Sequence, residues 1–181
     1  MSLCAAGITV GTAGLLEIPA LAAMQATCFA DGFGAEAETT EPAQGDSALG
    51  DSALGDSAWG ESALANLLAG PCCFALIALR EGEPAGFALA RQVADECELL
   101  SLGVLPTQRR LGVGRALLAA VCAEAAAKGS RHIYLEVAAD NWAGRALYEA
   151  LGFVPSAWRK NYYRRPGQAA IDAAVLVRHL V

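Results

Sequence analysis

Lysine and arginine are absent from the first 79 residues of this 181-residue chain, although the same segment holds nine acidic residues. All thirteen basic residues follow, beside ten acidic ones, and the net charge of the chain is −6. An acidic half next to a mildly basic half favours a basic peptide partner in one place and an anionic ligand in another, although a solvated acidic loop explains the first half more simply. The basic residues are too few to indicate a nucleic-acid partner.

Long hydrophobic runs are absent too. The sequence has no stretch of about 18 uninterrupted apolar residues, and no positive charge precedes an apolar segment near its first residue. We therefore expect a cytoplasmic protein without a membrane partner. Apolar residues make up 55% of the chain, which is enough for a buried core. Because 181 residues are too few for two well-packed units, we predict a single domain over residues 1–181.

Metal-binding patterns are also missing. The chain has six cysteines and two histidines, but it has no C-x-x-C pair, and no cysteine lies near a histidine in the sequence. These spacings argue against zinc sites, so we expect no bound metal. Buried free thiols are the expected state of the cysteines, which are Cys4, Cys28, Cys72, Cys73, Cys97 and Cys122.

A short tandem repeat is the most unusual feature that is present. Residues 45–64 read GDSAL, GDSAL, GDSAW and GESAL, which is too short a unit in too few copies for a solenoid. Small, polar and acidic residues bury too little surface to offset chain entropy, so we predict a mobile acidic loop at about 31–57. Only from about Ser57 does the segment become apolar enough for a short helix before Gly70.

Hydrophobic periodicity outside this loop predicts an alternation of strands and helices. The expected order is β-α-α-β-β-β-α-β-α-β-β. The bounded strands are 8–11, 72–80, 84–92, 98–105, 133–137 and 171–180, and the helices are 15–29, the short one from about 57, 113–128 and 141–151.

A glycine-arginine motif stands where the strand over 98–105 leads into the most regular helix. It reads Arg109-Arg110-Leu111-Gly112-Val113-Gly114-Arg115. Backbone N–H groups at a helix start are unsatisfied and attract phosphate oxygens, glycines allow close approach, and arginines add positive charge. The motif therefore predicts a diphosphate ligand, and the alternative is a glycine turn that leads into a helix with solvated arginines. The motif lacks G-K-[ST] and a third glycine, which argues against ATP and NAD.

The surrounding residues resemble a known family. R-x-x-G-x-G after a strand ending Leu102-Gly103-Val104 is similar to the acetyl-CoA signature of the GNAT acetyltransferases. Further matches are Leu135-Glu136-Val137, Asn141, Gly144, Ala146-Leu147-Tyr148-Glu149 and Leu151-Gly152-Phe153. The segment Arg159-Lys160-Asn161-Tyr162-Tyr163 resembles the R-x-N-Y-Y segment of the RimI-type ribosomal-protein alanine N-acetyltransferases.

The resemblance implies an α/β (α+β) fold, with a mixed, splayed and twisted sheet of about seven strands flanked by helices. The cofactor would be acetyl-CoA, with its pantetheine arm between the fourth and fifth strands, and Gly103 suits a bulge that starts the splay. The implied cofactor-binding residues are Leu102, Gly103, Val104, Arg109, Arg110, Leu111, Gly112, Val113, Gly114, Arg115, Asn141 and Gly144.

Two residues are candidates for proton transfer. Glu136, at the edge of the splay, would be the general base for the amine, and Tyr148 the general acid for the departing thiolate. Without a catalytic role, Glu136 would be an ordinary exposed strand residue, and Tyr148 would be an aromatic residue on the helix surface that packs on a loop. We expect Asn141, Gly144 and Tyr148 to share the ligand face of their helix, and Ala143, Ala146, Leu147 and Ala150 to face the core. For Tyr162 and Tyr163, core packing and substrate contact stay open.

The expected acceptor is a protein or peptide with a free N-terminus and basic character, and the RimI resemblance points to the N-terminal alanine of a ribosomal protein. A small-amine or lysine acetyltransferase, and a non-catalytic acyl-CoA-binding regulator, are the alternatives. The sequence also departs from the family, because Gln108 replaces a frequent aromatic residue and Leu105 replaces an acid.

Overall fold

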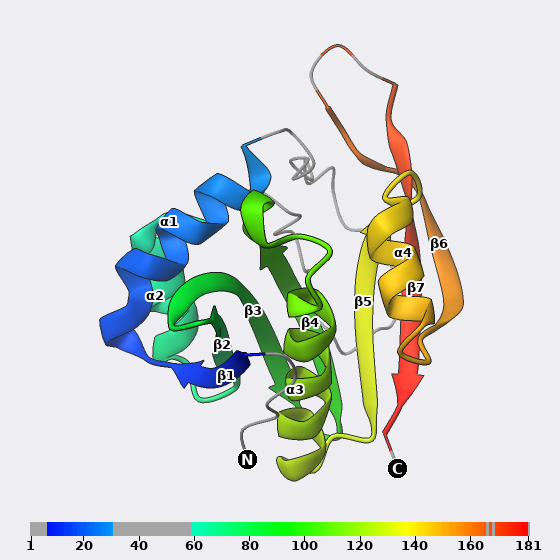
Figure 1. Ribbon diagram of the computed structural model, residues 1–181. Helices are drawn as coiled ribbons and strands as arrows, with labels where there is room; N and C mark the ends of the chain where they lie inside the picture. Colours follow the sequence, from blue (N-terminus) through cyan, green and yellow to red (C-terminus); the bar gives the residue numbers. More distant parts are fainter. Residues whose placement is uncertain (1–6, 31–58, 166, 168, 181) are drawn as a thin grey trace.

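A computed structural model describes residues 7–30, 59–165, 167 and 169–180 of the chain (Figure 1). The loop predicted at about 31–57 lies outside the described residues. The elements in chain order are β1 (Ile8–Ala13), the 3-10 turn η1 (Leu15–Glu17), α1 (Ile18–Phe29), α2 (Glu61–Ala69), β2 (Cys73–Arg80), β3 (Glu83–Val93), β4 (Glu96–Val104), η2 (Pro106–Gln108), α3 (Val113–Ala127), β5 (His132–Ala138), α4 (Trp142–Glu149), β6 (Val154–Tyr163) and β7 (Ile171–His179).

This order confirms the predicted alternation and the predicted fold class. Seven strands form one mixed sheet in the order β1-β2-β3-β4-β5-β7-β6. Every neighbouring pair is antiparallel except β4 and β5, which are parallel and joined by the crossover helix α3. The β2–β3 hairpin turns at Glu81 and Gly82, which both have positive φ, as a two-residue hairpin turn requires.

The sheet opens between β4 and β5. These strands pair only from Glu96 to Leu99 with His132 to Leu135, and beyond Leu99 the two strands are no longer paired. A shift in the β3–β4 register leaves Leu100 without an opposite residue, so Leu100 is a bulge at the point where pairing with β5 ends.

The prediction that Gly103 forms this bulge is wrong. Gly103 pairs regularly with Phe87 on β3, and a Cβ atom built on it would lie 2.4 Å from Cε1 of Phe87. The glycine is therefore required by close packing with an aromatic ring and not by a break in the strand.

Two apolar clusters cover the two faces of the sheet. The larger one packs α3 and Tyr148 of α4 against residues such as Leu99, Leu135 and Val137, and Figure 1 shows α3 and α4 in front of the strands. The smaller one packs α1 and α2 against the other face, with Phe87 and its neighbours at its centre. The faces remain separate because side chains alternate along each strand.

Cysteine burial follows the prediction only in part. Cys28, Cys97 and Cys122 are buried free thiols, and burial raises the pKa of the Cys28 thiol to about 11. Cys72, just before β2, is exposed and Cys73 is only partly buried, so the expectation of burial is wrong at Cys72, while Cys4 lies outside the described residues. None of the helices in the described part of the chain is long and apolar enough to cross a lipid bilayer.

Candidate active site

The end of β4, the start of α3 and the middle of α4 meet at one place. A Cβ atom on Gly114 would lie 3.1 Å from Cδ2 of Leu147, 3.5 Å from Cγ2 of Val104 and 4.0 Å from Cδ2 of Leu102. Gly114 therefore allows α4 to approach the first turn of α3. Sequence residues separated by more than forty positions are brought together here, beside the opening in the sheet.

The first turn of α3 offers backbone donors without a side-chain cap. Its N-cap residue, Gly112, has φ +90° and makes no side-chain cap hydrogen bond. Arg110 has φ +65°, and both Arg110 and Arg115 are exposed. Unsatisfied N–H groups at a helix start, next to exposed guanidinium groups, suit the binding of a diphosphate.

Arg109 has a different placement. Its Nε atom donates to the carbonyl oxygen of Val104 at 3.3 Å, and its Nη2 atom donates to that of Cys28 at 3.2 Å. The guanidinium group therefore ties the end of α1 to the end of β4. This contact gives Arg109 a task in the fold, whereas the sequence motif groups it with the residues that bind the cofactor.

Asn141 and Gly144 cooperate at the start of α4. The Asn141 side chain accepts a hydrogen bond of 2.9 Å from the Gly144 N–H and so caps the helix. A Cβ atom on Gly144 would lie 2.9 Å from Nδ2 of Asn141, so the glycine leaves room for the cap. Both residues have a structural reason for their identity, in addition to the predicted ligand role.

Glu136 lies in β5 just past the last residue that pairs with β4. Its neighbours Leu135 and Val137 belong to the cluster under α3 and α4, so the carboxylate points to the opposite face. Its Oε1 atom forms an ion pair of 3.0 Å with Nε of Arg159, and the Tyr162 hydroxyl donates a hydrogen bond to the carboxylate. The side chain is only 17% exposed.

This environment changes how readily the carboxylate takes up a proton. Burial raises the pKa of Glu136 above its ordinary range, the hydrogen bond from Tyr162 and the charge of Arg159 oppose the rise, and Glu98 adds to it. Burial and the negative charge of Glu136 also raise the pKa of Tyr162. A carboxylate with a raised pKa is a better proton acceptor, as a general base requires.

Tyr148 lies on the other side of the sheet from Glu136. The Tyr148 side chain is buried in the cluster under α3 and α4, with its ring 5.9 Å from that of Phe153. The predicted division of α4 into two faces is wrong, because Ala143, Ala146 and Ala150 are exposed and only Leu147 contacts the core. The helix turns Tyr148 inward beside Leu147, since residues i and i+1 are only about 100° apart.

Sequence reasoning missed the part that β6 plays. Arg159 and Tyr162 both contact Glu136, and the guanidinium carbon of Arg159 lies 5.3 Å from the centre of the Tyr162 ring. Tyr163 is buried against Ala138 and Ala173. The R-x-N-Y-Y segment is visible in the sequence, but its contacts depend on a strand that is not adjacent to β5.

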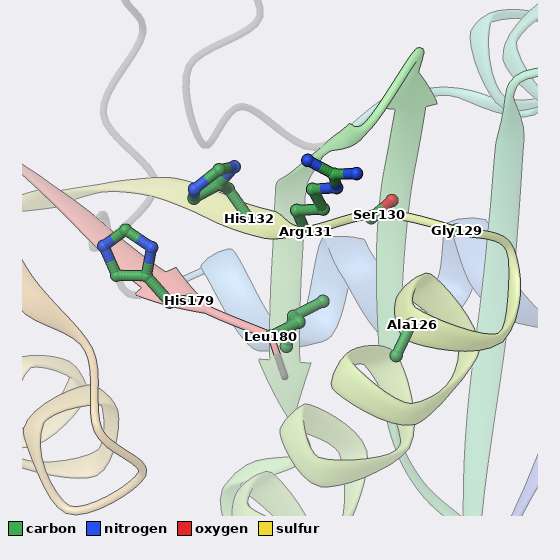
Figure 2. A pocket seen from close by; sticks show the side chains of 7 residues that line it. All are labelled: Ala126, Gly129, Ser130, Arg131, His132, His179 and Leu180. Carbon is green, nitrogen blue, oxygen red and sulfur yellow. The ribbon is translucent and has the colours of Figure 1, made fainter.

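A surface hollow among the described residues lies elsewhere. It has a volume of about 580 Å³ and is lined by Ala126, Gly129, Ser130, Arg131, His132, His179 and Leu180 (Figure 2). These residues surround the end of α3, a helix of 15 residues. At 1.5 Å per residue they lie roughly 20 Å from the first turn of α3. The hollow is therefore separate from the place where Gly114 lies.

Comparison with known proteins decides the family. The sequence profile of the Acetyltransferase (GNAT) family matches residues 32–153, which is more than half of the chain. This chain belongs to the acetyltransferase (GNAT) family. The resemblance to the GNAT acetyltransferases that the strand and glycine-arginine motifs indicated is thereby confirmed.

Two curated relatives carry the same name. The ribosomal protein bS18-alanine N-acetyltransferase of Escherichia coli strain K12 is 43% identical over 84 residues, which are 46% of this chain and 57% of that protein. The protein of the same name from Haemophilus influenzae is 38% identical over 95 residues, or 52% of this chain and 64% of that protein. The match therefore spans little more than half the length of these relatives.

Solved structures extend the fold comparison to nearly the whole chain. The ribosomal-protein-S18-alanine N-acetyltransferase from Escherichia coli superposes with a TM-score of 0.74 at 27% identity, over 96% of this chain and 94% of that one. A protein from Salmonella typhimurium that was solved with its cofactor acetyl-CoA gives a TM-score of 0.68 at 18% identity, over 97% and 95%. The GNAT fold is thus shared by the described residues as a whole.

Proposed function

We propose that this chain transfers the acetyl group of acetyl-CoA to the N-terminal α-amine of a protein, with the N-terminal alanine of a ribosomal protein as the preferred acceptor. The observation that carries the proposal is the placement of Glu136 and Tyr148 on opposite faces of the sheet, where β4 and β5 part. The shared name of the curated relatives supports the acceptor.

The residues around the opening fit the cosubstrate. Leu102, Gly103 and Val104 lie in the part of β4 that has lost its partner β5, so this edge has backbone groups to offer an amide-containing pantetheine arm. The uncapped first turn of α3 and exposed Arg110 and Arg115 suit the diphosphate. Leu111, Gly112, Val113 and Gly114 complete the loop and turn, while Arg109, Asn141 and Gly144 support it.

The chemistry needs one proton acceptor and one proton donor. Acetyl-CoA supplies a thioester, whose carbonyl carbon forms a bond to the amine nitrogen while its bond to sulfur breaks. Glu136 accepts the proton that the amine loses, directly or through a water molecule. Tyr148 gives its phenolic proton to the departing sulfur. Because the two groups lie on opposite faces, the acceptor and the leaving thiol use different sides of the sheet.

An α-amine suits this base better than a lysine side chain. An unperturbed α-amino group has a pKa near 8, whereas that of lysine is about 10.4, so a smaller fraction of lysine is uncharged at neutral pH. Glu98 on β4 and Glu136 on β5 contribute negative charge on the acceptor face, although Arg91 and Arg159 offset it.

The test compares two basic peptides of matched length. One has a free N-terminal alanine and acetylated lysines, and the other has a blocked N-terminus and one free lysine. Each is incubated with the chain and acetyl-CoA, and mass spectrometry locates the added acetyl group. We expect modification of the first peptide only, and a loss of kcat of about 10²-fold to 10⁴-fold in Glu136→Gln and in Tyr148→Phe.

The other outcomes identify other functions. Acetylation of the lysine peptide alone would contradict the proposal and indicate a lysine or small-amine acetyltransferase. A regulator would be indicated if the chain bound acetyl-CoA tightly but released no free CoA with any amine, and if Glu136→Gln left this binding unchanged. Activity that survives both substitutions would exclude the roles given to Glu136 and Tyr148 while leaving the acceptor assignment in place.

A further inference from the structure

Arg159 and Tyr162, which contact Glu136, lie on β6, and β6 does not pair with β5, the strand of Glu136. β6 is the edge of the sheet, and β7 lies between it and β5. Along this row, Arg159 pairs with Ala173 and Ala173 pairs with Ala138, two residues beyond Glu136. Because the residue of β7 in this row is an alanine, the long side chain of Arg159 has space to cross β7 and reach the carboxylate. The contact therefore depends on where β6 directs its side chains.

A break in the β6–β7 register controls that direction. Arg159 pairs with Ala173 and Tyr163 pairs with Ile171, so three residues of β6 stand opposite the single residue Asp172. Asn161, at the centre of this bulge, has φ +54°, a conformation that asparagine tolerates better than most residues. Bulges change the direction of side chains and are frequent next to active sites. Here Arg159, just before the bulge, and Tyr162, its last residue, both reach Glu136.

One hydrogen bond holds the bulge. The backbone N–H of Asn161 donates to Oδ1 of Asp172 at 2.8 Å. The acceptor is thus the side chain of the one residue that faces the bulge from β7. Asp172 is not the residue that pairs with Glu136, which is Val175, but it fixes the backbone between the two residues that contact the carboxylate.

We propose that the Lys160–Tyr162 bulge, held by Asp172, is a positioning device for the catalytic carboxylate, and that Asn161 and Asp172 are positioning residues. The inference rests on the proposed function, in which Glu136 is the general base. The bulge presents two donors to Glu136, Arg159 and Tyr162, and so fixes the carboxylate against the incoming amine. Glu98, the other acidic group beside Glu136, is held separately by Arg91 at 2.7 Å.

The test is a matched pair of substitutions at Asp172. Asp172→Asn keeps an oxygen that accepts the Asn161 N–H, whereas Asp172→Ala removes it. We expect Asp172→Ala to lower kcat/KM for the alanine peptide by about 10-fold to 100-fold, as misplacement of a catalytic group does, and Asp172→Asn to stay within about threefold of the unmodified chain. The dissociation constant of acetyl-CoA should be the same in all three proteins.

The pH profile distinguishes positioning from general destabilisation. In Asp172→Ala the acidic limb of kcat/KM should move to higher pH, because Arg159 and Tyr162 no longer favour the charged form of Glu136. At position 161, Asn161→Gly keeps access to positive φ and should retain activity, whereas Asn161→Val should lose it. Equal losses in Asp172→Ala and Asp172→Asn, or an unshifted limb in Asp172→Ala, would overturn the proposal.

A measurement without turnover keeps this result apart from the assignment of function. Hydrogen exchange of the Asn161 amide, followed by NMR, should be slow in the unmodified chain and in Asp172→Asn, and fast in Asp172→Ala. A chain that acetylates neither peptide would contradict the proposed function even if this exchange pattern holds. Rapid exchange in the unmodified chain would contradict the bulge device even if acetylation is found.

Discussion

At the scale of single residues, Glu136 is the group whose surroundings differ most from those of an ordinary surface carboxylate. Its side chain is mostly buried, forms an ion pair with Arg159 and accepts a hydrogen bond from Tyr162. Although both contacts favour the charged form, the pKa of Glu136 is raised. The burial of the charge thus outweighs the two favourable contacts. A carboxylate in this state lowers the stability of the fold at neutral pH, and such groups are frequent at functional sites.

The first prediction follows from that raised pKa. A carboxyl group whose pKa is raised on folding contributes stability that is complete below the pKa of the unfolded chain and is lost as pH rises through the pKa of the folded chain. Glu136→Gln should therefore have a higher free energy of unfolding than the unmodified chain at neutral pH, and the difference should vanish in acid. Denaturant unfolding at several pH values measures it. A variant that is less stable at neutral pH would show that the Arg159 ion pair outweighs burial.

Gly103 is a second residue whose identity is decided by contact. A methyl group there would lie 2.4 Å from Cε1 of Phe87, so Gly103→Ala should lower the free energy of unfolding by about 1–3 kcal/mol through overpacking. A Cβ atom on Gly11 in β1 would meet nothing within 4 Å, and Gly11→Ala is the control, expected within about 0.5 kcal/mol. Phe87→Leu should reduce the cost of Gly103→Ala, which a double-mutant cycle can measure; strict additivity would contradict the contact.

At the scale of elements, the loop and first turn of α3 divide their arginines between two tasks. Arg109 donates to backbone carbonyls of β4 and α1, while Arg110 and Arg115 are exposed beside the uncapped helix start. The sequence motif cannot separate these tasks, because all three residues have the same side chain. Both Arg110 and Gly112 have positive φ, so the chain turns between Arg109 and Arg115.

The division predicts different effects of alanine substitution. Arg115→Ala should raise the dissociation constant of acetyl-CoA about tenfold or more, as the loss of a charge-assisted hydrogen bond does, and should leave the binding of acetyl-pantetheine, which has no diphosphate, unchanged. Arg109→Ala should lower Tm instead, because two carbonyl oxygens lose their donor. Arg131→Ala, exposed near the far end of α3, is the control for loss of charge. Equal weakening of both ligands in Arg115→Ala would argue against a contact with the diphosphate.

At the scale of the whole molecule, the opening between β4 and β5 is the place where the sheet leaves strand edges unpaired. Four residue pairs join the strands at one end, and beyond them the strands part at the Leu100 bulge. Each strand is still paired on its other side, β4 with β3 and β5 with β7, so the opening does not unfold the sheet. The unpaired edges are where backbone N–H and C=O groups remain for a ligand.

Hydrogen exchange should reveal this opening. We expect amides of residues 101–104 to include a fast-exchanging set in the free chain, which becomes protected when acetyl-CoA binds, while residues 97–99 stay protected throughout. Peptide-resolved exchange by mass spectrometry, with and without acetyl-CoA, measures the change. Protection that appears around Arg131 and His132 instead would place the ligand in the hollow at the far end of α3.

The sequence by itself determined the order of the elements, the fold class and the family. Hydrophobic periodicity and the turn residues were sufficient for the elements, since these depend on local spacing, and the motif from Leu102 to Arg115 was sufficient for the resemblance. The prediction that Glu136 differs from an ordinary strand residue also came from the sequence, through its place beside the expected splay.

Only the tertiary structure decided which groups meet. It placed the bulge at Leu100 and explained Gly103 by the ring of Phe87, which belongs to another strand. It also turned Tyr148 into the core, and it brought Arg159 to Glu136 across Ala173 of β7. These contacts join residues far apart in the chain, and the pairing of strands that fixes them is set by packing of the whole sheet, which local patterns do not record.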